Sequence, residues 1–111
     1  DLPVIDPKMK LGEAIIKISF GKLGLAVAME DGKVAGLVTD GDIRRATERL
    51  HEGFFNVPVE EVMTRTPVCV PPTMKLGEIL NKLNNHKIHA VLVVGEDGQL
   101  LGIVDNFRCM M

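Results

Sequence analysis

The residues with the clearest chemical capability stand together in the stretch GLVTDGDIRR, residues 36–45. The Thr39 hydroxyl can donate a hydrogen bond to a phosphate oxygen. The Asp42 carboxylate can accept hydrogen bonds from sugar hydroxyls, as acidic residues do for ribose in dinucleotide-binding folds. Arg44 and Arg45 add cationic groups that suit phosphate. These residue types at this spacing predict a site for a phosphorylated sugar compound.

The expected backbone supports the same chemistry, because an apolar strand should end at Val38 and a helix should begin near Asp40. The free N–H groups of a helix start attract anions, and Gly41 lets a ligand approach the backbone closely. A structural interpretation stays open beside this one. Thr39 and Asp42 also have the spacing of a capping box, which contributes about 1 kcal/mol without any ligand.

A repeated pentapeptide shows how the elements are organised. MKLGE occurs at residues 9–13 and again at residues 74–78, 65 positions later. After each copy, apolar residues recur with the spacing i, i+3, i+4, i+7, which predicts an amphipathic helix. These residues are Leu11, Ala14, Ile15 and Ile18 in the first copy and Leu76, Ile79, Leu80 and Leu83 in the second.

The strands follow the same repeat. Short apolar runs separated by an Asp-Gly turn predict hairpins of buried strands in both copies. The predicted strands are residues 25–29 and 34–38, then 90–94 and 100–104, with extended pieces at 3–5 and 67–72 and a second helix from about residue 40 to 50. One extra residue, most simply Gly95, lengthens the second hairpin.

The sequence therefore predicts an α/β (α+β) fold built from two βαββα copies. Copy 1 spans residues 1–53, a connecting segment spans 54–66, and copy 2 spans 67–111 without its last helix. A unit of about 50 residues buries only about 60% of its chain surface. We therefore expect the two sheets to pack face to face as a pseudo-twofold pair, with clefts for a ligand between the copies.

Composition excludes several classes of function. A formal net charge of −2 supplies no basic field, so we expect no nucleic-acid binding. No apolar run approaches the ~20 residues of a membrane span, and two cysteines are too few for a disulfide framework. His86 and His89 would offer a metal two ligands at most. We expect a cytoplasmic protein that binds neither metal nor membrane.

The paired repeat, with a glycine before VTDGDI at a strand-to-helix junction, resembles cystathionine-β-synthase (CBS) domains, which occur in tandem as Bateman modules. In that family a G-h-h-[ST]-x-x-D stretch binds adenosine nucleotides. The resemblance implies that Thr39 contacts phosphate and Asp42 contacts ribose. It extends the expected contacts to neighbouring residues and to the helix-to-strand loops of both copies. These further candidates are Val4, Lys22, Gly24, Asp40 and Arg45 in copy 1 and His86, Lys87 and His89 in copy 2. The histidines also fit solvent-exposed loop positions.

The second copy departs from the family motif, because GIVDNFRC stands opposite GLVTDGDI. Asp105 takes the place of Thr39, and its carboxylate would repel phosphate. Arg108 takes the place of Asp42 and cannot accept a hydrogen bond. We therefore expect no nucleotide site of the usual kind in the second copy, although Arg108 could reach a ligand or form a surface ion pair.

The stretches DLPVIDPKMKLGEAI, KLGLAV, TDGDIRR and EVMTRTP, in this order, are similar to the C-terminal CBS pair of D-arabinose 5-phosphate isomerases, which serve Kdo synthesis. TDGDIRR also occurs in CBS pairs of sugar-nucleotide transferases, which remains the alternative. The resemblance implies a sugar isomerase (SIS) catalytic domain on the N-terminal side. Catalysis by this chain is not expected, since Asp40 and Asp42 would point to different faces of the helix start.

The resemblance implies a regulatory ligand-binding module that requires no cofactor. Its ligand would be AMP, ADP, ATP or, by pathway logic, the nucleotide-sugar CMP-Kdo. A homodimer formed through the CBS pairs is also expected. The rival interpretation is a structural one, in which the module only dimerises and Thr39 and Asp42 only cap a helix.

Overall fold

The computed structural model describes residues 2–20, 24–86, 88, 90–105 and 109–110. The chain divides into two compact units, Pro3–Thr66 and Pro67–Met111. No helix among the described residues is both long enough and apolar enough to cross a membrane.

The first unit contains the elements predicted for copy 1, with boundaries that differ by at most a few residues. In chain order they are β1 (Val4–Ile5), α1 (Leu11–Phe20), β2 (Leu25–Glu30), β3 (Lys33–Thr39) and α2 (Asp40–Leu50). Two short 3₁₀ helices then follow α2, namely η1 (His51–Phe55) and η2 (Val59–Glu61). Neither 3₁₀ helix was predicted from the sequence, because each is held by packing rather than by an apolar period.

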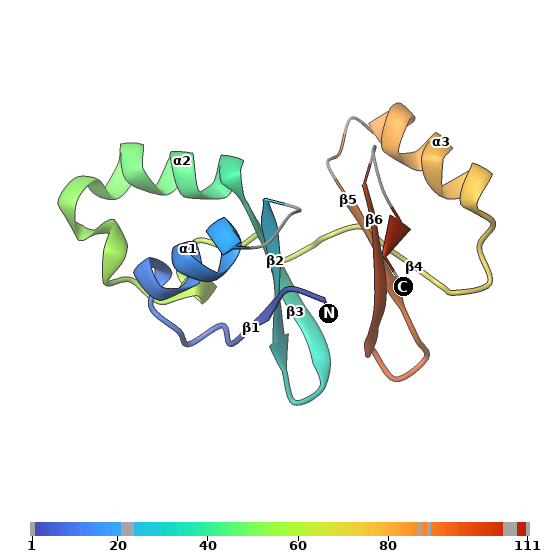
Figure 1. Cartoon of the computed structure of the whole chain (residues 1–111), viewed down its shortest axis with the longest axis horizontal. Helices are drawn as coiled ribbons and strands as arrows, with labels where there is room; N and C mark the ends of the chain where they lie inside the picture. The colour runs from blue at the N-terminus through green and yellow to red at the C-terminus, as the bar shows by residue number, and fades with distance from the viewer. Residues whose placement is uncertain (1, 21–23, 87, 89, 106–108, 111) are drawn as a thin grey trace. The chain divides into compact units, whose positions relative to one another are not determined.

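The sheet of the first unit has the order β1-β2-β3 (Figure 1). Strand β1 is parallel to β2, since α1 carries the chain back to the start of the sheet, and β2 is antiparallel to β3. The predicted Asp-Gly turn joins β2 to β3, with positive φ at both Asp31 (53°) and Gly32 (77°). Positive φ at both central positions is the condition for the two-residue turn that matches strand twist.

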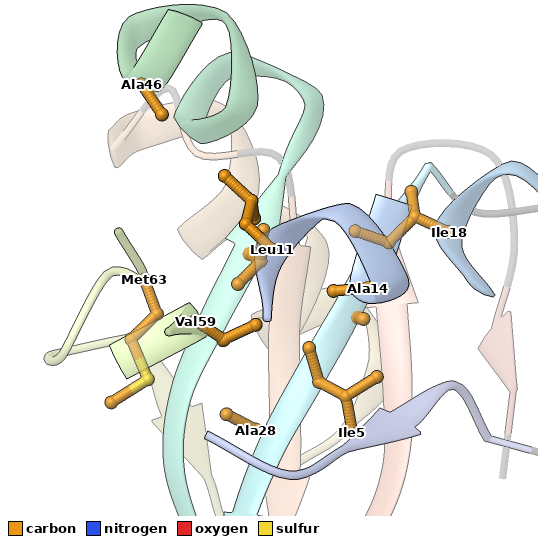
Figure 2. Close-up of a cluster of buried hydrophobic side chains, with 10 residues drawn as sticks. Ile5, Leu11, Ala14, Ile18, Ala28, Ala46, Val59 and Met63 are labelled. Atoms are coloured by element: carbon orange, nitrogen blue, oxygen red, sulfur yellow. The ribbon is translucent and has the colours of Figure 1, made fainter. Parts of the chain in front are cut away.

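The core of the first unit lies between the sheet and its two helices. Figure 2 shows Leu11, Ala14 and Ile18 of α1 gathered with side chains from β1, β2 and η2. The remaining members of this buried cluster are Ile5, Ala26, Ala28, Val38, Ala46, Val59 and Met63. The residues after α2 therefore belong to this core, and Phe54 packs against it.

The second unit repeats the pattern with β4 (Cys69–Val70), α3 (Leu76–His86), β5 (Ala90–Val94) and β6 (Leu100–Asp105). Its hairpin is longer, because residues 95–99 separate the strands and Gly95 N–H donates to the Gln99 carbonyl at 2.9 Å. A short strand, β7 (Cys109–Met110), then pairs antiparallel with β6 and completes a four-stranded sheet of order β4-β5-β6-β7. Strand β7 was not predicted from the sequence, because its two residues are too few to show a period.

The structure confirms the α/β (α+β) class and the tandem repeat. The two pairs of central strands even share their register, because Leu25 lies opposite Thr39 and Ala90 lies opposite Asp105.

Candidate functional site

The candidate site begins where β3 passes directly into α2. Thr39 is the last residue of β3 and the N-cap of α2, with extended φ and ψ of −117° and 170°. Its hydroxyl accepts a hydrogen bond from the Asp42 N–H at 3.3 Å, while the Asp42 carboxylate accepts from the Thr39 N–H at 3.0 Å. This reciprocal pair is the capping box predicted from the spacing of Thr39 and Asp42.

The Asp42 carboxylate is the buried polar centre of the site, with only 6% of the residue exposed. Besides the Thr39 N–H, three side-chain donors reach it. The hydroxyl of Thr39 is 3.2 Å from Oδ2, the guanidinium of Arg45 is 2.7 Å from Oδ1, and the hydroxyl of Thr64 lies 3.2 Å from Oδ1 and 3.3 Å from Oδ2. A charged carboxylate is stable in a buried position only when hydrogen-bond donors surround it. The four donors therefore hold the Asp42 carboxylate in place as a hydrogen-bond acceptor.

Arg45 folds back over the first turn of α2 to reach Asp42. Its side chain is 63% exposed, and one of its guanidinium nitrogens lies 3.3 Å from the place that a Cβ at Gly41 would occupy. Gly41 thus leaves room for the guanidinium close to the backbone. The Arg45 end of this ion pair is exposed and the Asp42 end is buried, so water can solvate the guanidinium when it turns toward a phosphate.

Thr64 is a site residue that the sequence analysis did not identify. It belongs to EVMTRTP, a stretch used above only as a family signature, and it lies 22 positions from Asp42. A local pattern cannot indicate a hydrogen bond over this separation, so the sequence carried no usable signal for it.

The backbone explains how Thr64 reaches the site. It forms an isolated β-bridge with Leu37 of β3, with N···O distances of 2.8 and 2.9 Å. Gly36 makes this approach possible, because a Cβ there would lie 2.5 Å from Met63 Sδ and 2.9 Å from the Thr64 carbonyl oxygen. Gly36 is therefore needed for residues 63–64 to pack against β3 and for Thr64 to reach Asp42.

Other predicted residues of copy 1 lie around this centre in different ways. Gly24 has φ +66°, and a Cβ added to it would lie 2.9 Å from Asp40 Oδ2, so Gly24 and the exposed Asp40 are neighbours beside the helix start. Val4 is 44% exposed on β1, two strands away from β3 in the sheet order. Arg44 is exposed on α2, and only its backbone carbonyl has a described contact, with the Thr47 hydroxyl.

Several predictions fall outside what the structure describes. Lys22, Lys87, His89 and Arg108 lie outside the described residues. His86 is the last residue of α3. Their assignment to a ligand therefore stays a prediction.

In the second unit, Asp105 occupies the strand position of Thr39, as their shared register shows. Asp105 is 9% exposed and makes an interaction of its own. A buried carboxylate in this position cannot donate to a phosphate when it is ionised. The two repeats are therefore chemically unequal at the corresponding point.

A hollow of about 380 Å³ lies elsewhere in the second unit, lined by residues 69–73 and 94–96. Cys69 is among the lining residues and is exposed, although it belongs to strand β4. Partial burial nevertheless raises the pKa of its thiol above the ordinary value. Within the described part of the chain no group of three His, Cys, Asp or Glu side chains is arranged to hold a metal ion.

Comparisons with known proteins find relatives that match nearly the whole chain. The arabinose 5-phosphate isomerase KdsD of Yersinia pestis is 35% identical over 105 residues, which are 94% of this chain and 31% of that protein. The isomerase KpsF of Escherichia coli is 27% identical over 108 residues, which are 96% of this chain and 33% of that protein. The chain thus spans about a third of the length of these relatives.

Among solved structures, a CBS domain protein of Pyrobaculum aerophilum complexed with AMP superposes with a TM-score of 0.83 at 21% identity, covering 96% of this chain and 85% of that one. The family profile of the CBS domain matches residues 1–49 and again residues 59–106. Two matches, two folded repeats and a Thr-x-x-Asp motif at the β3–α2 junction lead to one conclusion: the chain belongs to the CBS domain family, as a tandem pair similar to part of the arabinose 5-phosphate isomerases.

Proposed function

We propose that this CBS pair is a regulatory module that binds a ribonucleotide at the β3–α2 junction of its first repeat. The observation that carries the proposal is the Asp42 carboxylate, a buried acceptor held at the start of a helix beside the Thr39 hydroxyl. A sugar hydroxyl pair needs an acceptor of this kind, and a phosphate favours the adjacent helix N-terminus.

Each group has a defined role in this proposal. Asp42 accepts hydrogen bonds from the ribose hydroxyls. Thr39 rotates its hydroxyl proton toward a phosphate oxygen while its lone pair continues to accept from the Asp42 N–H. Arg45 leaves Asp42 and pairs with the same phosphate, while the Thr39 N–H and the ribose hydroxyls donate hydrogen bonds to the Asp42 carboxylate. The further contacts predicted above, and the location of the ligand between the repeats, stay predictions.

The relatives suggest what the module regulates. KdsD and KpsF are arabinose 5-phosphate isomerases, so we propose that the parent protein is an isomerase of the Kdo pathway with a separate SIS catalytic domain. AMP in the Pyrobaculum protein supports an adenine nucleotide as the ligand, and CMP-Kdo is the alternative that pathway feedback would favour. Because coupling between sites is reciprocal, a ligand that stabilises one arrangement of the pair would bias the catalytic domain.

Isothermal titration of the chain with AMP, ADP, ATP, CMP and CMP-Kdo tests the proposal, with a thermal melt beside each titration. A ligand at 100 times its Kd should add about 2.7 kcal/mol to stability, which is several degrees for a domain of this size. Asp42→Asn should abolish binding. Glu48→Gln removes the same charge from an exposed position of the same helix and should leave binding unchanged. Loss of binding in both variants, or no binding by the unaltered chain, would refute the site.

A second function is favoured by a specific observation, namely that four donor groups already satisfy Asp42 without a ligand. In that case the site is a helix cap, and the module serves to dimerise the parent protein. Sedimentation of the chain with and without nucleotide separates the two. A concentration-dependent dimer that binds none of the five compounds would favour the structural function.

A further inference from the structure

The hydrogen bonds of Asp42 limit how a ligand can reach it. A carboxylate offers about four lone-pair positions. In this structure they are taken by the Thr39 N–H, the Thr39 hydroxyl, the Thr64 hydroxyl and the Arg45 guanidinium. A ribose brings two further donors, its 2′ and 3′ hydroxyls, so resident donors must leave before both can bind.

The donors differ in how easily they can leave. The Thr39 N–H is fixed by the helix cap and cannot turn away. Arg45 is mostly exposed and can move to a phosphate. The Thr39 hydroxyl can redirect its proton to the phosphate as well. These two departures free one lone-pair position on Oδ1 and one on Oδ2. The edge between the two oxygens, which a diol spanning both of them would face, is occupied by the remaining donor.

That remaining donor is Thr64, whose hydroxyl lies 3.2 and 3.3 Å from the two oxygens of the carboxylate. It therefore covers the edge between Oδ1 and Oδ2, where a vicinal diol would place one hydroxyl on each oxygen. These are long bonds for a hydroxyl donor, and Thr64 is exposed, so water can satisfy its hydroxyl after it leaves.

We infer that Thr64 is a positioning residue that holds the Asp42 carboxylate in the ligand-free state and is displaced when a vicinal diol binds. The inference rests on the proposed ribonucleotide site and deepens it, since it makes Thr64 a determinant of ribose against deoxyribose. A ligand with a single sugar hydroxyl leaves one oxygen of Asp42 to Thr64. A ligand with two sugar hydroxyls occupies both oxygens of Asp42 and leaves none to Thr64.

The location of Thr64 gives this exchange a consequence along the chain. The second family match begins at Val59, whereas the first compact unit extends to Thr66. Residues 59–66 thus belong to the second repeat in the family match, but they pack on the first compact unit in the structure. Release of the Thr64 hydroxyl loosens the attachment of this shared segment to the site, next to the point where the second unit begins.

The test compares ribonucleotides with their 2′-deoxy analogues. Kd values for AMP and 2′-deoxy-AMP, and for CMP and 2′-deoxy-CMP, are measured by titration calorimetry for the unaltered chain and for Thr64→Val, Thr64→Ser and Thr66→Val. Valine keeps the shape and the backbone bridge of Thr64 but removes the hydroxyl. Thr66→Val is the matched control, because it makes the same change at an exposed position two residues later.

Thr64→Val should bind the ribonucleotide about fivefold more tightly, the equivalent of one net hydrogen bond, and should bind the deoxy analogue as the unaltered chain does. Thr64→Ser and Thr66→Val should keep the original ratio of affinities. A merely structural Thr64 would lower the melting temperature and shift both affinities by one common factor, which would overturn the inference alone. An unaltered chain that binds neither pair of nucleotides would overturn the ribonucleotide site, and this inference with it.

Discussion

The two copies of MKLGE are the same five residues in two different environments. In the first copy, Leu11 is completely buried, whereas its counterpart Leu76 is 50% exposed. A Cβ on Gly12 would lie 3.1 Å from the Phe55 ring, whereas one on Gly77 would meet nothing within 4 Å. The chemistry of the pentapeptide is identical, so the difference comes from what packs on it.

The covering element in the first unit is the segment that follows α2. Leu11 N–H donates to the Val57 carbonyl at 2.8 Å, and Val59 N–H donates to the Met9 carbonyl at the same distance. In the described part of the second unit no segment stands in the corresponding place over Leu76 and Gly77. An amphipathic pattern therefore predicts which residues can be buried. How many of them are buried depends on whether a neighbouring segment of the chain covers them.

Truncation of the two leucines should show the largest difference. Leu11→Ala should reduce the free energy of unfolding by about 2–5 kcal/mol, because it opens a cavity in a packed core. Leu76→Ala should change it by about 0.5 kcal/mol or less, as expected for a surface position. Urea unfolding followed by circular dichroism measures both. Equal losses would mean that Leu76 is covered in solution, and the comparison drawn here would then be wrong.

The β3–α2 junction of the first unit can be tested next, because its Thr39 corresponds to an acidic residue, Asp105, in the second unit. Asp42→Ala should cost about 1–3 kcal/mol, more than an ordinary cap, since it removes the acceptor that the Thr39 N–H shares with three side-chain donors. Thr39→Ala should cost about 1 kcal/mol. Chemical unfolding of each variant without nucleotide checks the values. A cost for Asp42→Ala no greater than that of Thr39→Ala would show that Thr64 and Arg45 add nothing to the cap.

The paired glycines provide a smaller test with opposite signs. Gly77→Ala should stabilise the chain by about 0.5 kcal/mol, because alanine favours a helix and the site is open. Gly12→Ala should destabilise it, since its Cβ would press on both the ring and the backbone oxygen of Phe55 at 3.1 and 3.2 Å. Melting temperatures measure the two changes. A gain at Gly12 would mean that η1 yields easily and covers α1 only loosely.

The equivalent strands β1 and β4 allow the mildest test. Cys69 occupies in β4 the exposed position that Val4 has in β1. Burial raises the pKa of its thiol, so less thiolate is present at a given pH. In a Cys109→Ser background, iodoacetamide should alkylate Cys69 more slowly than the thiol of an unstructured cysteine peptide at pH 8, and the difference in rate should close as the pH rises. A rate equal to that of the peptide thiol would contradict this burial.

Local patterns in the amino-acid sequence were enough to predict the repeat, the strands and helices common to both copies, the hairpin turns and, as one of two open interpretations, the Thr39–Asp42 cap. Each of these depends on residues at most a few positions apart, so that a period, an Asp-Gly pair or an i, i+3 spacing states the interaction directly. Their predicted bounds agree with the structure for this reason.

The tertiary structure set the remaining features. It brought Thr64 to Asp42 across 22 residues, laid Phe55 on Gly12, left Leu76 exposed and added β7 to the second sheet. These features depend on contacts between segments that are far apart in the sequence. Such contacts form where side chains pack closely and where buried polar groups find hydrogen-bond partners. No local spacing encodes these contacts, so identical pentapeptides can end in different surroundings.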